Sequence, residues 1–219
     1  MLISNKIEDL DLDFLEGLPL ALGLGKEDTV LPDPSLVKYY DNLRNRVMYI
    51  ENELDREYLI EFTKMVIAWN REDKNVPVEK RKPIKIMIYS YGGEIDSVQH
   101  FIDICLLSKT PIWTYNLGTA MSGGFYILLA GSKRFALKNS QALLHEGSGG
   151  TNGTAEQVRN QQAQYTKQLK TLAEYTLERT KITKEVYSRK KKSEWYINGE
   201  EQVSYGIVDK IITDIDDLT

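Results

Sequence analysis

A serine in a glycine-rich turn and a histidine downstream of it are the residues of this chain best suited to chemistry. Ser122 lies in the segment Gly118-Thr-Ala-Met-Ser-Gly-Gly124, and His145 ends an apolar run 23 residues later. A serine hydroxyl becomes a nucleophile when a general base within hydrogen-bond reach accepts its proton. Backbone N–H groups beside such a serine can stabilise the oxyanion that forms when it attacks a carbonyl. The pair therefore indicates acyl transfer.

A purely structural role would use the same residues. A glycine pair after a strand also forms a plain turn, a serine at the start of a helix is a common N-cap, and a lone histidine is more often structural than catalytic. Neither the spacing of a phosphate-binding P-loop nor a dinucleotide fingerprint is present. On these residues alone, a nucleophile and a structural turn both stay open.

Alternating strands and helices are predicted to position these residues. Runs of β-branched residues predict the strands, and apolar residues at helical spacing predict the helices. The predicted strands are 47–50, 84–89, 111–116, 141–145 and 206–212, and the predicted helices are 53–70, 94–107, 122–130 and 155–180. This alternation is typical of βαβ units in a mainly parallel sheet, the α/β class. Sites of such sheets lie at the carboxyl ends of the strands, where Ser122, His145 and the turn Ser90-Tyr-Gly-Gly93 all fall.

The domain is predicted to span 36–219. One segment is predicted to precede it and another to project from it. Residues 1–35 are acidic with an apolar, glycine-rich patch, and form an N-terminal extension that either packs on another surface, such as a second subunit, or is a loosely ordered arm. A glycine-rich stretch, 146–154, precedes the 155–180 helix. A helix this long and polar projects from a domain more easily than it is buried, so we expect its apolar stripe to meet another subunit.

Size and charge exclude several classes of protein. The chain has 219 residues and a mass of 25.1 kDa, which suits one large domain. Lys plus Arg number 28 against 32 for Asp plus Glu, and this net charge of −4 gives no electrostatic basis for binding nucleic acid.

The cysteine and histidine content and the hydropathy exclude further classes of protein. A single cysteine, Cys105, and two histidines permit neither an internal disulfide nor a His-rich metal site. No apolar run is long enough for a transmembrane helix. We therefore expect a cytoplasmic protein that needs no metal or cofactor and has no membrane partner.

Taken together, these residues resemble the proteolytic subunit of the Clp protease (ClpP) from about Arg46 to the C-terminus. The motifs that carry the resemblance are the 90–93 turn, the Ser122 segment, Lys133–His145, Gly149-Gly150 and Glu200–Lys210. Several motifs in the family's order are far more specific than any one of them. The resemblance implies the ClpP/crotonase type of α/β fold, with repeated βαβ units, a mainly parallel sheet and a projecting handle helix within about 146–182.

The resemblance also implies a function, that of a serine-type endopeptidase forming the ATP-independent core of a self-compartmentalised protease. Ser122 would be the nucleophile, His145 the general base, and the backbone N–H groups of Gly93 and Gly123 the oxyanion hole. Members of the family form homo-oligomers of stacked heptameric rings. An AAA+ unfoldase normally supplies their peptide and protein substrates.

The chain departs from the family pattern at the third catalytic position. Lys190 falls where the family has its aspartate. A lysine cannot accept the imidazole N–H, and its charge opposes the imidazolium that forms during attack. Another acceptor, such as Glu194, Glu185 or a backbone carbonyl, would restore the triad. A weaker Ser–His dyad and an inactive protein are the other two outcomes.

Two further departures concern partners. Lys85 and Met87 replace the aromatic pair of the family's unfoldase docking pocket, although Phe135 matches a pocket aromatic. Residues 1–35 do not resemble the family's short axial segment. Docking of the usual unfoldase and axial gating are therefore not carried over from the family.

Three other functions are possible on the same scaffold. A non-catalytic ring subunit, structural or regulatory, would account for the missing aspartate. A protease like signal peptide peptidase A would use a Ser–Lys dyad with Lys190, Lys167 or Lys170, but His145 and the lack of a membrane anchor count against it. A crotonase-type enzyme acting on acyl-CoA would have no need of Ser122 and His145 together.

Overall fold

The computed structural model describes residues 33–218. Contacts between residues divide the chain after Asp41, and the candidate site lies wholly within the unit 42–219. Helix α2 (Pro34–Asn45) crosses this division. Most of the N-terminal extension predicted for 1–35 lies outside the described residues. Among the described helices, none is long and apolar enough to cross a membrane.

Seven strands of the described chain form one sheet, with the order β1-β2-β3-β4-β7 and with β5 joined to β3 and β6. Their bounds are β1 (Val47–Ile50), β2 (Ile84–Ser90), β3 (Ile112–Met121), β4 (Lys133–Leu137), β5 (Gln141–Leu144), β6 (Trp195–Asn198) and β7 (Lys210–Ile212). Only β5 and β6 pair antiparallel, and every other pairing is parallel. The predicted α/β class with a mainly parallel sheet is therefore confirmed.

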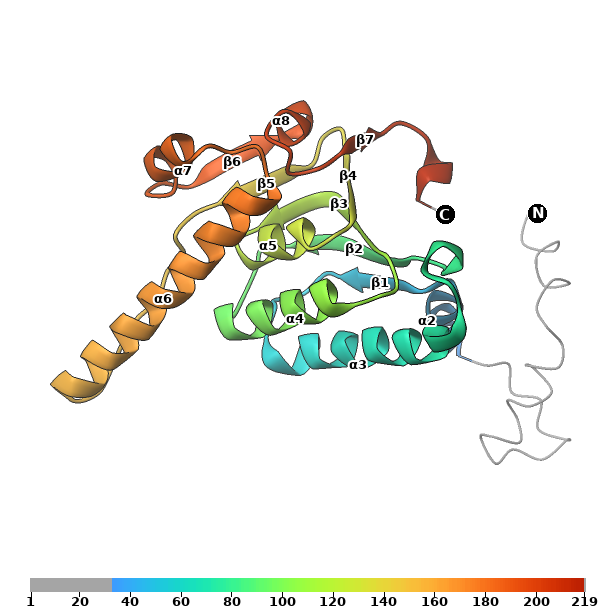
Figure 1. Ribbon diagram of the computed structural model, residues 1–219, viewed down its shortest axis with the longest axis horizontal. Helices are drawn as coiled ribbons and strands as arrows, with labels where there is room; N and C mark the ends of the chain where they lie inside the picture. The colour runs from blue at the N-terminus through green and yellow to red at the C-terminus, as the bar shows by residue number, and fades with distance from the viewer. Residues whose placement is uncertain (1–32, 219) are drawn as a thin grey trace, which may run out of the picture. The chain divides into compact units, whose positions relative to one another are not determined.

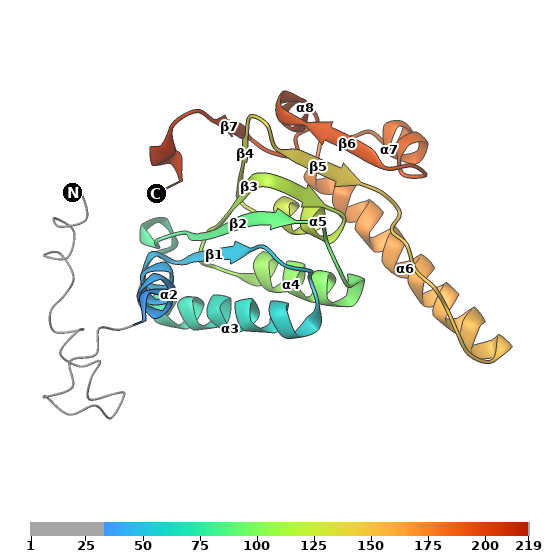
Figure 2. The ribbon, with the colours of Figure 1, turned by 180° about the vertical axis from the view of Figure 1, so that it is seen from behind.

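Helices connect the strands and cover the sheet. They are α3 (Arg56–Glu72), α4 (Ile95–Leu107), α5 (Gly123–Leu129), α6 (Ala155–Arg179), α7 (Lys184–Lys190) and α8 (Gly199–Ser204). Short 3-10 turns lie at Asp73–Asn75, Val78–Lys80 and Ile215–Asp217. Within the unit 42–219, α3 and α4 lie side by side against one face of the sheet (Figure 1). Turned by 180°, the same unit shows the other face of the sheet in front of these helices (Figure 2).

The alternation of side chains along β2 explains why this strand lies inside the sheet, between β1 and β3. Ile84, Ile86 and Ile88 are completely buried in the larger core, which includes residues of α3, α4 and α5. Met87, one residue out of phase, instead packs with Tyr115 in a second cluster. Successive side chains of a strand point to opposite faces, so β2 requires apolar cover on both. The three isoleucines made this strand predictable from the sequence.

Several elements were not predicted. Strands β4 and β6 and helices α7 and α8 are short, and β3 extends five residues beyond its predicted end at Asn116. This extension pairs with β5, from Thr119 opposite Gln141 to Met121 opposite Leu143. Pairing partners far away in sequence therefore determine where β3 ends. The last strand is shorter than predicted, because Gly206 has a φ of 67° and forms a turn.

Helix α6 is the projecting element expected from the sequence. Thr154 begins it with a capping box, in which its side chain accepts from the Gln157 amide and the Gln157 side chain accepts from the Thr154 amide. Its buried residues, Leu172 and Thr176, lie in its C-terminal half. The N-terminal half extends away from the sheet in both ribbon views (Figures 1 and 2).

A partly buried ion pair ties the end of α3 to the start of β1. Arg46 Nη1 lies 2.6 Å from Asp73 Oδ2, and the Thr110 hydroxyl donates to the same oxygen at 2.8 Å. The Arg46 guanidinium holds the pKa of Asp73 below its usual value. A carboxyl whose pKa is lowered on folding stabilises the fold above its unfolded pKa, near 3.9, and loses this contribution as the pH falls through the folded value.

Asp73→Asn is therefore expected to lower the free energy of unfolding by about 3 kcal/mol at pH 7, because it leaves the partly buried Arg46 charge with only its longer ion pair, at 3.4 Å to the exposed Glu72. Urea denaturation at pH 7 and at about pH 3 measures the difference. The difference should shrink as the pH falls through the folded-state pKa of Asp73, because the wild-type carboxyl then becomes protonated as well. A difference that does not depend on pH would contradict the role given to this charge.

Candidate active site

Ser122 occupies a strained turn between β3 and α5. Its φ of 51° and ψ of −117° lie outside the regions that side chains favour. Its amide donates to the Leu143 carbonyl of β5 at 3.0 Å, which fixes the end of β3 to its neighbour. Strain of this kind costs on the order of 1–3 kcal/mol and persists only where the surroundings impose it. The turn places the serine at the carboxyl end of the central strand.

The glycine turn after β2 packs directly against this serine. Gly92 has a φ of 108°, and a Cβ atom added there would lie 2.8 Å from Ser122 Cβ and 2.9 Å from the Gly123 nitrogen. A Cβ atom on Gly93 would lie 2.5 Å from the backbone of Leu54. Both glycines are therefore required by close approach of backbone segments, and not only by the turn.

The backbone amides of Gly93 and Gly123 are the free donors near Ser122. Neither makes a backbone hydrogen bond in the turns, loops and caps of the described chain. They are also close together, since a Cβ atom on Gly123 would lie 3.3 Å from the Gly93 nitrogen. Gly123 begins α5, where the first N–H groups of a helix have no partner within the helix. Two unpaired amides thus lie beside the serine.

His145 directly follows β5, the strand that pairs with the end of β3. Its Nε2 atom is buried and has no hydrogen-bond partner among the described residues. Ser122 and His145 line the same groove, together with Gly93 and Gly123. The adjacent strand ends expected from the sequence therefore do bring these four residues together. The hydrogen bond between serine and histidine is not formed in this structure.

The groove has a volume of about 910 Å³. Its apolar lining comes from α4, β3, β5 and α6 and consists of Ile95, Val98, Met121, Leu143, Leu169 and Leu172. Its charged lining consists of five glutamates, Glu51, Glu53, Glu94, Glu146 and Glu194, and within the described residues no lysine or arginine lines it. Of these five, only Glu194 was predicted from the sequence as a site residue. The others follow strand ends or glycine turns, a position that could have indicated them.

Lys190, at the position of the missing aspartate, does not line this groove. Its Nζ lies 5.6 Å from the ring centroid of Trp195, in a cation–π contact. The neighbouring Lys191 instead pairs with Glu146, at 2.6 Å between Nζ and Oε1. The end of α7 is thus joined to the residue that follows His145.

Of the alternative acceptors, Glu194 lines the groove and Glu185 does not. The pairing of β5 with β6 ends at Leu144 opposite Trp195, and His145 and Glu194 are the residues next to this last pair on the two strands. Glu194 Oε2 accepts a hydrogen bond from the Tyr196 hydroxyl at 3.1 Å, and this bond raises the pKa of Tyr196. The carboxylate makes no hydrogen bond or ion pair with the imidazole in the described chain.

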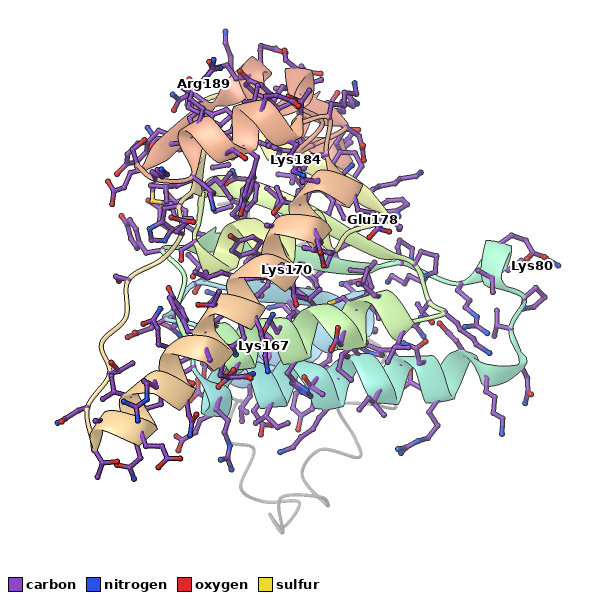
Figure 3. All side chains as sticks on the ribbon, turned by 60° about the vertical axis from the view of Figure 1, so that its left-hand side comes forward. Lys80, Lys167, Lys170, Glu178, Lys184 and Arg189 are labelled. Carbon is purple, nitrogen blue, oxygen red and sulfur yellow. The ribbon has the colours of Figure 1, made fainter. Side chains whose placement is uncertain are left out.

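The lysines that a Ser–Lys dyad would use do not lie in the groove. Lys167 and Lys170 both belong to α6 (Figure 3), and neither lines the groove. The Lys170 side chain is 77% exposed and lies 3.7 Å from Glu174. Within the described chain, the groove therefore offers no lysine beside Ser122.

A mainly parallel sheet with this groove at the carboxyl ends of its strands places the chain in the ClpP class of α/β folds. Residues 33–215 match the family model described as Clp protease, and the chain belongs to this family. The family is one of serine-type peptidases, and the chain is a divergent member of it.

Curated relatives agree with this assignment. The chain is 27% identical over 173 residues to ATP-dependent Clp protease proteolytic subunit 2 of Corynebacterium efficiens, covering 78% of this chain and 84% of that one. It is 28% identical over 173 residues to proteolytic subunit 1 of Corynebacterium jeikeium, covering 78% and 89%. It is also 28% identical over 186 residues to the proteolytic subunit of Chlorella vulgaris, covering 84% and 90%.

Proposed function

We propose that this chain is an active serine endopeptidase subunit that cleaves peptide bonds through an acyl-enzyme. The observation that carries the proposal is the meeting of Ser122, the unpartnered Nε2 of His145 and two free glycine amides in one groove. A nucleophile, a base and oxyanion donors are the three parts that acyl transfer needs. The geometry supports each role separately.

In the proposed reaction, Ser122 Oγ attacks the scissile carbonyl while His145 Nε2 takes its proton. The amides of Gly93 and Gly123 donate to the oxyanion. The imidazolium then gives its proton to the leaving amine, the C–N bond breaks, and the acyl group stays on Ser122. Water, activated by the same imidazole, hydrolyses this ester and restores the serine.

Glu194 is the proposed positioning residue for His145. Its place next to the last β5–β6 pair, as His145 is on the other strand, and in the same groove supports this role. A turn of the side chain away from Tyr196 would bring the carboxylate toward the imidazole, and hydrogen bonds of this kind often tighten only when substrate binds. Lys190 has no part in this arrangement.

The assembly and the partner are proposed from the family. The relatives are named as proteolytic subunits of an ATP-dependent protease. This chain would therefore form stacked rings around a chamber, with α6 joining rings, and would depend on a separate AAA+ unfoldase for ATP hydrolysis. The mostly exposed N-terminal half of α6 supports a contact of this kind.

A fluorophosphonate probe tests the function, because it labels an activated serine whatever the substrate. We expect the wild-type protein to gain the mass of one probe per chain on Ser122, and His145→Ala to lose labelling by at least about 10³-fold in rate. Peptide mapping locates the label, and light scattering on the same sample measures the assembly.

Lys167→Ala/Lys170→Ala serves as the control and should label like the wild type. Labelling that survives His145→Ala would contradict the proposed base. An assembled protein that is not labelled at all would favour the second candidate, a non-catalytic ring subunit, for which the lysine at position 190 is the specific observation.

A further inference from the structure

The charged side chains that line the groove are all negative, and they lie on both of its sides. Glu51 and Glu53 lie between β1 and α3, and Glu94 precedes α4, so these three rim the groove on the side of the glycine turn. Glu146 follows β5 and Glu194 precedes β6, on the side of His145. A peptide substrate bound across Ser122 in this groove would have carboxylates near both of its ends.

Most of this charge is not neutralised by the protein. Glu146 has Lys191 as a partner, but Glu51, Glu53, Glu94 and Glu194 make no ion pair with any described residue. Glu94 and Glu194 accept hydrogen bonds only from neutral hydroxyl groups, those of Ser97 and Tyr196. Clefts lined by one sign of charge concentrate the field and attract ligands of the opposite sign.

The distribution of the carboxylates does not suit a metal ion. No group of three or more His, Cys, Asp or Glu side chains among the described residues is close enough to hold one. The carboxylates are instead spread along a groove whose lining is apolar, with Leu143 and Leu172 among its residues. An extended ligand with apolar and basic side chains complements both features.

We infer that the groove selects cationic substrates, namely peptide segments with apolar residues at the scissile bond flanked by Lys or Arg. This inference rests on the proposed function, since Ser122 defines where the scissile bond lies. Glu51 and Glu53 act on one flank of the substrate. Glu94 adds charge on the same side, close to the Gly93 amide.

Internally quenched peptides with one common apolar core, flanked by Lys, Gln or Glu, test the selectivity. We expect kcat/KM for the Lys peptide to exceed that for the Glu peptide by at least about 10-fold at low ionic strength, and the ratio to shrink as salt screens the charges. Glu51→Gln/Glu53→Gln should reduce this ratio about threefold or more, because two exposed charges near the substrate are removed.

The matched control is Glu57→Gln/Glu79→Gln, which removes two exposed glutamates that do not line the groove. It changes the net charge equally and should leave the ratio unchanged. An equal reduction in both double variants would mean that net charge, and not the groove, sets the preference. Equal cleavage of all three peptides, or a preference for the Glu peptide, would overturn the inference and leave the hydrolytic function intact.

Binding provides an independent measurement. Fluorescence anisotropy with the Ser122→Ala protein compares the same peptides without cleavage, and the Lys peptide should bind at least about 10-fold more tightly at low salt. If the wild type neither cleaves peptide nor labels with the probe, the proposed function fails, while this measurement still decides the charge preference. Equal affinities would overturn the inference.

Discussion

Ser122→Gly is expected to abolish peptide hydrolysis and at the same time to stabilise the fold. The activity should fall by about 10⁴-fold or more, because no other group supplies the attacking oxygen. The free energy of unfolding should rise by about 1 kcal/mol, because glycine adopts a positive φ without the strain that the serine carries. The backbone angles of 51° and −117° are the basis for this second effect.

Ser122→Ala separates the two effects. Alanine also lacks the hydroxyl but keeps the Cβ atom, so it should be as inactive as glycine without the gain in stability. Urea denaturation and peptide hydrolysis on the three proteins measure both quantities. If glycine and alanine were equally stable, the turn would carry no strain. If either variant kept more than about 1% of the activity, Ser122 would not be the nucleophile.

Glu194→Gln is expected to lower kcat by about 10²-fold, the second largest effect. The amide keeps the size of the side chain but loses the charge that is proposed to orient and stabilise the imidazolium of His145. The acidic limb of the pH–rate profile should also move to lower pH, because a neighbouring carboxylate favours the protonated imidazole. A purely structural role for Glu194 would not move this limb.

Two variants test this assignment. Glu185→Gln, on α7 and outside the groove, should behave like the wild type. Tyr196→Phe releases Glu194 from its hydrogen bond, so it should retain or increase the activity. An activity of Glu194→Gln within about threefold of the wild type, with an unchanged pH profile, would mean that His145 works without this carboxylate.

The sequence predicted the positions of the reactive groups better than their surroundings. Ser122, His145 and the two glycine turns are marked by local signals, namely strand ends followed by glycine, and the structure places them in one groove. Strand β6 is not marked by such a signal in the sequence, because it has only four residues and ends in a polar one. It forms a strand only because it pairs with β5. The position of Glu194 depends on that pairing.

The same distinction holds for the fold. Strand β2 and helix α4 were predicted nearly to the residue because burial on both faces, or on one stripe, requires a continuous apolar pattern. Strand β4 was not, since Lys133-Arg-Phe-Ala-Leu137 is partly exposed and mixes charge with apolar residues. Its neighbours β3 and β7 lie 12 or more residues away along the chain, so only the tertiary fold shows that it is a strand.

The pairing of β6 with β5 has a consequence for synthesis of the protein. The groove gathers segments that begin at Glu51 and end at Tyr196, and its last wall is supplied by one of the final strands. During translation a chain forms its contacts from the N-terminus onward. A ribosome-bound chain that has not yet exposed Tyr196 holds Ser122 without a complete cleft around it. The groove around Ser122 is therefore completed only near the end of synthesis.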